Sequence, residues 1–363
     1  MAQMYIHVIF YFATNSNSML MLKTSFICLA FLCLSACATS CNNADSASTQ
    51  SLSITAENIS ENLGTQWVPV ALNDKDETVS AFVMTKKGRL IAGTSAGVFL
   101  SDDKGQTWSP ATINPDDKAA VFSLAIDAEG TIYAGLSRYG VLVSDDNGNS
   151  WKLYNTGLNK GGPRSSYALL AAGSNILKGT LESGVYLSAD KGKTWQPSNN
   201  GIPLNLMDNK MVSVSQLVQN EQTVYALTDL GVRYSNDKGK TWNKPAHNGI
   251  ERLGYMQSLA VNKSNLFTGI GTSQKGVFVS ADNGENWKAS GLSGKAVSAL
   301  FTAPNGVVYA GAEGEIFRSA DHGKTWTAAG TGLPPKSAVY AIGITPEGKL
   351  LAGINRKGIY LLK

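Results

Sequence analysis

Short apolar runs alternate with polar turns along most of the chain. "AVFSLAI" at 120–126 is followed by the turn "DAEG", then by "TIYAG" at 131–135 and "GVLVS" at 140–144. Val, Ile, Phe, Tyr and Leu fill the runs, and Gly, Asn and Asp fill the turns, which is typical of β-strands joined by tight turns. The 37 glycines and the low charged fraction of 16% agree with this pattern. The sequence therefore predicts an all-β protein.

An octapeptide, Ser-x-Asp-x-Gly-x-(Thr/Ser/Asn)-Trp, punctuates the strands at regular intervals. Its six copies are "SDDKGQTW" at 101–108, "SDDNGNSW" at 144–151, "SADKGKTW" at 188–195, "SNDKGKTW" at 235–242, "SADNGENW" at 280–287 and "SADHGKTW" at 319–326. Together with Trp67, the seven tryptophans lie 39 to 47 residues apart. A period of this length, with strand-like content, predicts a β-propeller with one four-stranded blade per repeat.

The first strand of each repeat gives the number of blades. Seven segments align without gaps: "VSAF" 79–82, "VFSL" 121–124, "SYAL" 166–169, "VSQL" 214–217, "MQSL" 256–259, "VSAL" 297–300 and "VYAI" 339–342. Their third residue is small in every copy except Gln216, as the crowded strands around an axis require. We therefore predict seven blades of four antiparallel strands over residues 64–363.

The two ends of the repeat region complement each other. After Trp326 the seventh repeat has only three strands, whereas "QWVPVAL" at 66–72 is an outer strand with no blade before it. We predict that strand 66–72 pairs with the C-terminal strand and closes the ring as three strands plus one. Closure removes the exposed sheet edges that would promote aggregation.

The octapeptide resembles the Asp-box, or BNR repeat, of sialidases, xyloglucanases, sortilin-type receptors and the photosystem II assembly factor family, and the resemblance covers residues 66–363. Ser and Asp side chains can bond to the backbone of a tight turn in which Gly takes a positive φ, and the Trp can pack between blades. Six copies along one chain favour a structural role over a catalytic one. The residues expected to serve it are Asp103, Asp146, Asp190, Asp237, Asp282, Asp321, Trp67, Trp108, Trp151, Trp195, Trp242, Trp287 and Trp326.

The N-terminal part resembles an export signal. We interpret residues 1–18 as preceding the true start, and 19–36 as a signal peptide with an apolar core too short to span a bilayer. "LSAC" at 34–37 resembles a bacterial lipobox, which implies that Cys37 is lipidated; ordinary cleavage after Ala36 or Ala38 is the alternative. Residues 37–63 are then a polar tether. We expect a lipid-anchored protein of the bacterial cell envelope, at the outer membrane.

Catalytic motifs find little support in the sequence. The histidines are His7, His247 and His322, too scattered for a triad or a metal site. No Arg-Ile-Pro motif of the sialidases is present. The net charge of +4 is weak and dispersed, which argues against nucleic-acid binding. We expect no cofactor, no metal and a monomer.

Function is expected on the face opposite the octapeptides, where loops join the blades and the second and third strands. The longest loops are 154–166, 197–211 and 245–254. The side chains predicted to form a basic and aromatic binding rim are Arg138, Tyr139, Arg164, Tyr167, Glu182, Arg252, Tyr255, Lys275, Arg356 and Lys357. Such a rim suits a protein or a glycan partner.

Two functional hypotheses follow. The first is a non-catalytic, lipid-anchored binding or assembly scaffold, for which the photosystem II assembly factors are the nearest resemblance. The alternative is a glycoside hydrolase of the sialidase or xyloglucanase type, which needs two carboxyl groups about 5–10 Å apart. Its candidate catalytic residues are Glu182 and Glu251, with Asp229 and Glu313 as further acids near the predicted rim.

Overall fold

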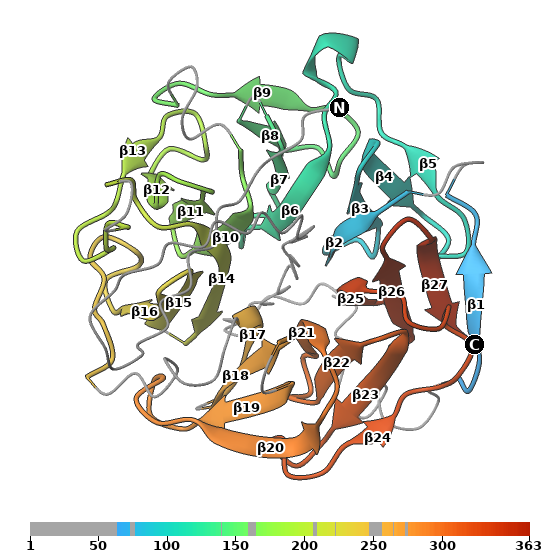
Figure 1. Cartoon of the computed structure of the whole chain (residues 1–363). Coiled ribbons are helices and arrows are strands. Elements are labelled where there is room, and N and C mark those ends of the chain that lie inside the picture. The colour runs from blue at the N-terminus through green and yellow to red at the C-terminus, as the bar shows by residue number, and fades with distance from the viewer. Residues whose placement is uncertain are drawn as a thin grey trace, which may run out of the picture. The chain divides into compact units, whose positions relative to one another are not determined.

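The computed structural model describes residues 64–72, 77–138, 140–158, 165–205, 209–221, 223–246, 256–263, 265–272 and 275–363. These residues form seven antiparallel sheets arranged as the blades of a propeller (Figure 1). The predicted signal peptide, Cys37 and the tether lie outside the described residues. No helix in the described ranges is long and apolar enough to cross a membrane.

Each blade runs outward in chain order from its inner strand, except that blade 7 takes its outermost strand from the N-terminal end of the propeller. Blade 1 contains β2 (Val79–Met84), β3 (Leu90–Thr94), β4 (Gly97–Ser101) and β5 (Ser109–Pro110), and the short 3₁₀ helix η1 (Pro115–Asp117) leads to blade 2. Blade 2 contains β6 (Val121–Ile126), β7 (Ile132–Leu136), β8 (Val141–Ser144) and β9 (Lys152–Tyr154). Blade 3 contains β10 (Ala168–Ala172), β11 (Asn175–Gly179), β12 (Val185–Ser188) and β13 (Gln196–Pro197).

The remaining blades follow the same order. Blade 4 contains β14 (Val214–Asn220), β15 (Thr223–Thr228) and β16 (Gly231–Ser235), and blade 5 contains β17 (Met256–Asn262), β18 (Asn265–Ile270), β19 (Gly276–Ser280) and β20 (Lys288–Ser293). Blade 6 contains β21 (Val297–Thr302), β22 (Val308–Ala312), β23 (Glu315–Ser319) and β24 (Thr327–Ala328). Blade 7 contains β25 (Val339–Ile344), β26 (Leu350–Ile354), β27 (Gly358–Leu362) and β1 (Trp67–Val70).

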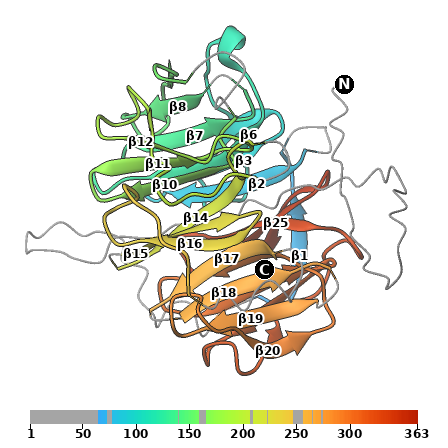
Figure 2. The ribbon, with the colours of Figure 1, turned by 60° about the vertical axis from the view of Figure 1, so that its left-hand side comes forward.

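Neighbouring blades pack face to face around the axis. The inner strands β2, β6, β10, β14, β17, β21 and β25 contact one another in this order, and β25 contacts β2 again; Figure 2 shows several of them side by side. The apolar clusters span two blades each: Phe267 of blade 5, for example, packs in one cluster with Leu300 and Val308 of blade 6. The core is therefore distributed over the interfaces between blades.

The ring closes through the N-terminal strand, as predicted. Strand β1 pairs antiparallel with β27, with Trp67 opposite Leu362. The Trp67 side chain is 2% exposed. Its Nε1 donates to the Ala329 carbonyl at 2.8 Å, and its backbone N donates to the Thr331 carbonyl at 2.7 Å. Trp67 therefore ties the last blade to the segment that leads into it from blade 6.

Blade 4 departs from the four-stranded pattern. Its sheet has three strands, and the expected outer strand is reduced to a single bridge between Tyr234 and Asn243. Pro245, which has no N–H to donate, follows shortly after this bridge and cannot extend a ladder as a donor. Gln216, the large residue among the small ones at the third inner position, is 1% exposed and accepts a hydrogen bond from the backbone N of Leu259 in blade 5.

Removing the Trp67 side chain should destabilise the propeller strongly. We expect Trp67→Ala to lower the free energy of unfolding by about 3–5 kcal/mol, because the substitution leaves a cavity at the closing interface and removes a buried hydrogen bond. Equilibrium unfolding in denaturant measures the change. Ser109→Ala, on the exposed outer strand β5, is the control and should change stability by less than about 0.5 kcal/mol. Equal effects of the two substitutions would contradict the role of Trp67.

Candidate functional site

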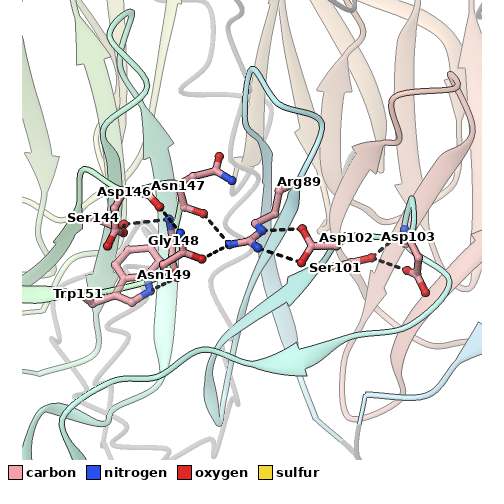
Figure 3. Close-up of polar contacts among 11 residues, drawn as sticks. Arg89, Ser101, Asp102, Asp103, Ser144, Asp146, Asn147, Gly148, Asn149 and Trp151 are labelled. Atoms are coloured by element: carbon pink, nitrogen blue, oxygen red, sulfur yellow. Dashed lines mark hydrogen bonds and ion pairs between the residues drawn. The ribbon is translucent and has the colours of Figure 1, made fainter.

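The octapeptides form tight turns held by their own side chains. In blade 2, Ser144 Oγ donates to Asp146 Oδ1 at 2.8 Å and accepts from Gly148 N at 2.9 Å (Figure 3). The Asp146 carboxylate also accepts from Ser150 N at 2.9 Å and from Ser150 Oγ at 2.6 Å. Trp151 Nε1 donates to the Gly148 carbonyl at 3.1 Å. These side chains are therefore engaged in fixing the turn.

The other octapeptides have the same core. In all six, the Ser hydroxyl donates to the Asp carboxylate over 2.6–2.8 Å. Two successive residues take positive φ, for example Asn147 at 66° and Gly148 at 87°. A non-glycine residue in this conformation is uncommon, and Asn is among those that adopt it most readily. His322 occupies the same left-handed position with φ 61° and is exposed.

One arginine joins the octapeptide turns of blades 1 and 2. Arg89, in the turn between β2 and β3, donates from Nε and Nη2 to the two oxygens of Asp102 at 2.7 and 2.9 Å. Its Nη1 donates to the Asn147 carbonyl at 3.0 Å and to Asn149 Oδ1 at 2.8 Å (Figure 3). All three guanidinium nitrogens are therefore occupied within the protein, and Arg89 is not free to bind a substrate carboxylate.

The turn geometry lowers the pKa of every octapeptide Asp. Partial burial, the largest single influence on Asp146, raises its pKa, but the hydrogen bonds from Ser150 and Ser144 together outweigh it and lower the pKa to about 2. In Asp321 the hydrogen bonds from Thr325 are the largest influence, and they also lower the pKa. The same direction holds for Asp103, Asp190, Asp237 and Asp282.

The opposite end of the ring, here called the mouth face, is built from the starts of the inner strands and the turns between second and third strands. Ser137 N donates to the Ala120 carbonyl at 2.8 Å within blade 2, and Ser166 N of blade 3 donates to the Leu136 carbonyl of blade 2 at 2.9 Å. These bonds hold each turn against the start of an inner strand. The predicted short loops of the rim therefore share one face.

A recurrent β-bulge shapes this face. In six blades the pairing of the first two strands shifts register at the second residue of the aligned inner segment. The residues at the bulge are Ser80, Phe122, Ser215, Gln257, Ser298 and Tyr340, and Tyr167 occupies this place in blade 3. A bulge bends its strand and changes the direction of a side chain, and bulges are frequent next to binding sites. Sequence alignment identified these positions but did not reveal the bulge.

Two aromatic bulge residues meet between blades 2 and 3. The rings of Phe122 and Tyr167 lie 4.9 Å apart between centroids, with a tilt of 32°. Both side chains are half-buried. Burial is the main cause of the raised pKa of Tyr167, and the negative charge of Glu182 raises it further. Glu182 itself is exposed and accepts from Lys210 Nζ at 2.6 Å.

The structure thus brings Tyr167 and Glu182 together and adds two residues that the sequence reading of the rim omitted. Phe122 was available from the inner-strand alignment as the aromatic counterpart of Tyr167. Lys210 lies in the predicted loop 197–211, but its pairing with Glu182 joins positions 28 residues apart. No local sequence signal identifies such a pair.

The other predicted rim residues fall into two groups. Arg138, Lys275, Arg356 and Lys357 are exposed at turns between second and third strands. Lys275 donates to Glu313 at 3.3 Å, and the backbone N of Arg356 donates to Thr78 Oγ1 at 3.1 Å. Tyr139, Arg164, Glu251, Arg252 and Tyr255 lie outside the described residues.

The acids proposed for hydrolysis have different environments. Glu182 is paired with Lys210. The backbone hydrogen bond from Ala296 is the largest cause of the lowered pKa of Glu313, and Lys275 lowers it further. Burial raises the pKa of Asp229, the direction that a proton-donating carboxyl group requires. The described residues contain no group of three or more His, Cys, Asp or Glu side chains that could hold a metal ion.

These features define a seven-bladed propeller built on Asp-box turns. The family model of the photosynthesis system II assembly factor YCF48 matches residues 59–361, and the chain belongs to this family. No curated protein sequence matches the chain.

Solved structures show the same fold. YCF48 bound to D1 peptide has a TM-score of 0.63 and 19% identity, over 83% of this chain and 95% of that one. The extracellular domain of a hybrid two-component system from B. thetaiotaomicron has a TM-score of 0.64 and 15% identity. The match covers 82% of this chain but only 40% of that longer chain. The Niastella koreensis GH74 enzyme has a TM-score of 0.61 and 17% identity, and the match covers 81% of this chain and 53% of that one.

The lowered pKa values predict a specific loss of stability in acid. A carboxyl group whose pKa is lower in the folded state stabilises the fold above its unfolded pKa of about 3.9 and loses that contribution as the pH falls through the folded value. We expect stability to fall between about pH 4 and 2, with a shallower fall in Asp146→Asn. Denaturant midpoints measured across this range test the slope.

The control for this experiment is Asp145→Asn. Asp145 is exposed next to Asp146, and its substitution removes the same charge while leaving the hydrogen bonds of the turn in place. It should keep more of the wild-type slope than Asp146→Asn does. Identical slopes for the two variants would show that the turn carboxylate does not cause the acid sensitivity.

Proposed function

We propose that this protein is a non-catalytic scaffold that binds a protein partner through its mouth face, in the bacterial cell envelope. The observation that carries the proposal is the match to an assembly-factor family over residues 59–361, which covers the propeller except for its last two residues. One protein of similar fold was solved with a bound D1 peptide. This supports a protein partner in preference to a glycan.

The chemistry of the mouth face supports binding. The half-buried pair of Phe122 and Tyr167 offers apolar and aromatic surface, and Arg138, Arg356 and Lys357 add exposed positive charge on turns of the same face. Aromatic residues and Arg are the residue types most enriched at protein interfaces and at their energetic centres. A partner segment that combines an apolar side chain with acidic residues would match this surface.

The acids of the mouth face favour binding over hydrolysis. Glu182 and Glu313 each pair with a lysine, and the pKa of Glu313 is lowered, first by the backbone hydrogen bond from Ala296 and then by Lys275. A glycosidase acid must instead carry a proton at working pH. The raised pKa of Asp229 alone does not supply the second carboxyl group that the glycoside hydrolase alternative needs.

Removing two exposed cations of the mouth face should weaken partner binding. We expect Arg138→Ala/Arg356→Ala to reduce capture of the partner from envelope extract roughly tenfold, since two interface contacts of about 0.5–1 kcal/mol each are lost. Quantitative pull-down with the purified propeller measures the change. The matched control is Lys193→Ala/Lys324→Ala, which removes two exposed charges from the octapeptide turns at the opposite end. Equal losses for both double variants would refute binding through the mouth face.

We further propose that a lipid on Cys37 anchors the propeller, with residues 38–63 as the tether. The support is the "LSAC" sequence after an apolar run of signal-peptide length. Cys37→Ala expressed in a bacterial host should move the protein from the membrane fraction to the soluble fraction and abolish metabolic labelling with a fatty-acid analogue. Cys41→Ala is the control and should keep both the label and the membrane fraction. Labelling that survives Cys37→Ala would exclude this anchor.

A further inference from the structure

A buried arginine breaks the repeat pattern in blade 4. Arg233, the third residue of β16, is 5% exposed and lies opposite Ala226 of β15. The equivalent residue of each other blade is apolar or aromatic: Phe99, Leu142, Tyr186, Phe278, Phe317 and Tyr360. Six blades therefore show that the fold requires no charge at this position.

Arg233 lies on the side of blade 4 that faces blade 3. Residues directly opposite on paired strands share one face of a sheet, so Arg233 is on the same face as Ala226. Ala226 packs in one apolar cluster with Leu177 and Val185 of blade 3 and with Ile202 from the segment that joins the two blades. The guanidinium group is thus placed at an apolar junction between blades.

The charge of Arg233 is only partly accommodated. Its Nη1 donates to the carbonyls of Leu230 at 3.3 Å and Val232 at 2.9 Å. In the described part of the chain, Nε and Nη2 have no hydrogen-bond partner and no carboxylate forms an ion pair with Arg233. Burial lowers the pKa of Arg233, as expected for a charge removed from water without a counter-ion.

Arg89 in the same protein shows what the open side of such a guanidinium can bind. Arg89 also places Nη1 on a backbone carbonyl, that of Asn147, and its Nε and Nη2 hold the two carboxylate oxygens of Asp102 (Figure 3). Arg233 likewise places Nη1 on backbone carbonyls, but no carboxylate in the described residues occupies its Nε and Nη2. The planar Nε and Nη2 edge matches two oxygens of one carboxylate, and paired bonds of this kind are among the strong hydrogen bonds of proteins.

We propose that the Nε and Nη2 edge of Arg233 binds a carboxylate group that comes from outside the chain, at the junction of blades 3 and 4. Leu230, whose carbonyl accepts from Arg233, is 49% exposed and offers apolar surface next to this site. The carboxylate belongs either to a small organic acid or to the free C-terminus of a peptide. The site is distinct from the cations Arg138 and Arg356 that the proposed partner binding uses.

Direct binding measurements test this proposal on the full propeller. The probes are succinate, as a small organic acid, and an N-acetylated dipeptide with a free C-terminus, with its C-terminal amide as the uncharged comparison. Calorimetric titration and the probe-dependent shift of the melting temperature give the affinity. We expect at least one of the two acids to bind, and Arg233→Gln to weaken that binding roughly ten- to hundredfold, since two hydrogen bonds to a charged group are lost.

Two further variants distinguish the contribution of the planar guanidinium group from that of its charge and from any effect on protein stability. Arg233→Lys keeps the charge without the planar fork and should bind more weakly than wild type. Arg233→Leu reproduces the residue found at Leu142 in blade 2, so it should fold and melt at or above the wild-type temperature without probe, because an uncompensated buried charge is removed. It should show no probe-dependent shift. Lys193→Gln, which removes an exposed charge from an octapeptide turn at the opposite end of the ring, is the control and should bind the probe as wild type does.

Each outcome decides the proposal. Binding of succinate that is lost in Arg233→Gln supports a small-acid ligand, and binding of the dipeptide acid but not its amide, lost in the same variant, supports a peptide terminus. The proposal is overturned if neither acid binds the wild-type protein, if Arg233→Gln binds as tightly as wild type, or if Lys193→Gln weakens binding as much as Arg233→Gln does. None of these results depends on whether the protein partner of the mouth face is captured.

Discussion

The pairing of β1 with β27 is the interaction on which the rest of the structure depends. The apolar clusters lie between blades, so a blade needs a neighbour on each side to bury its faces. Trp67 of the closing strand packs with residues of blades 6 and 7, and the last blade in turn packs against blade 1, where Leu351 and Ile359 share a cluster with Phe99. Opening this one junction would expose apolar surface of both end blades and leave a free sheet edge.

The two ends of the ring have different tasks. At the octapeptide end, Ser and Asp side chains are committed to their own turns, and Arg89 joins two such turns through Asp102 and Asn147. The Ser and Asp side chains at that end already have hydrogen-bond partners within the protein. At the mouth face, backbone bonds and Thr hydroxyls hold the turns, as where Thr180 Oγ1 donates to the Gly184 carbonyl. The exposed Arg138 side chain takes no part in these bonds. Residue types can vary there without loss of the propeller.

The repeats in the sequence are sufficient to predict the architecture of the propeller. The blade number, the strand order and the closure by residues 66–72 all follow from the spacing of the octapeptides and the odd strand at Trp67. The register shift that creates the bulges and the pairing of Glu182 with Lys210 depend on contacts between separate segments, which no local pattern encodes. The predicted roles of Tyr139, Arg164 and Glu251 stay predictions, because these residues lie outside the described part of the chain.

Comparing equivalent positions in the seven blades shows which residue types the fold requires. The positions that depart from the common residue type lie in blades 3 and 4. Lys178 is fully buried where other blades have Ala or Thr. Gln216 replaces a small inner residue and Arg233 replaces an apolar one, and among the described residues blade 4 has no ladder of an outer strand. Burying a charge costs free energy that an apolar residue at the same place does not. Because no other blade carries a charged residue at either position, the fold itself does not require a charge there. For Arg233, the binding of an external carboxylate proposed above would account for the buried charge.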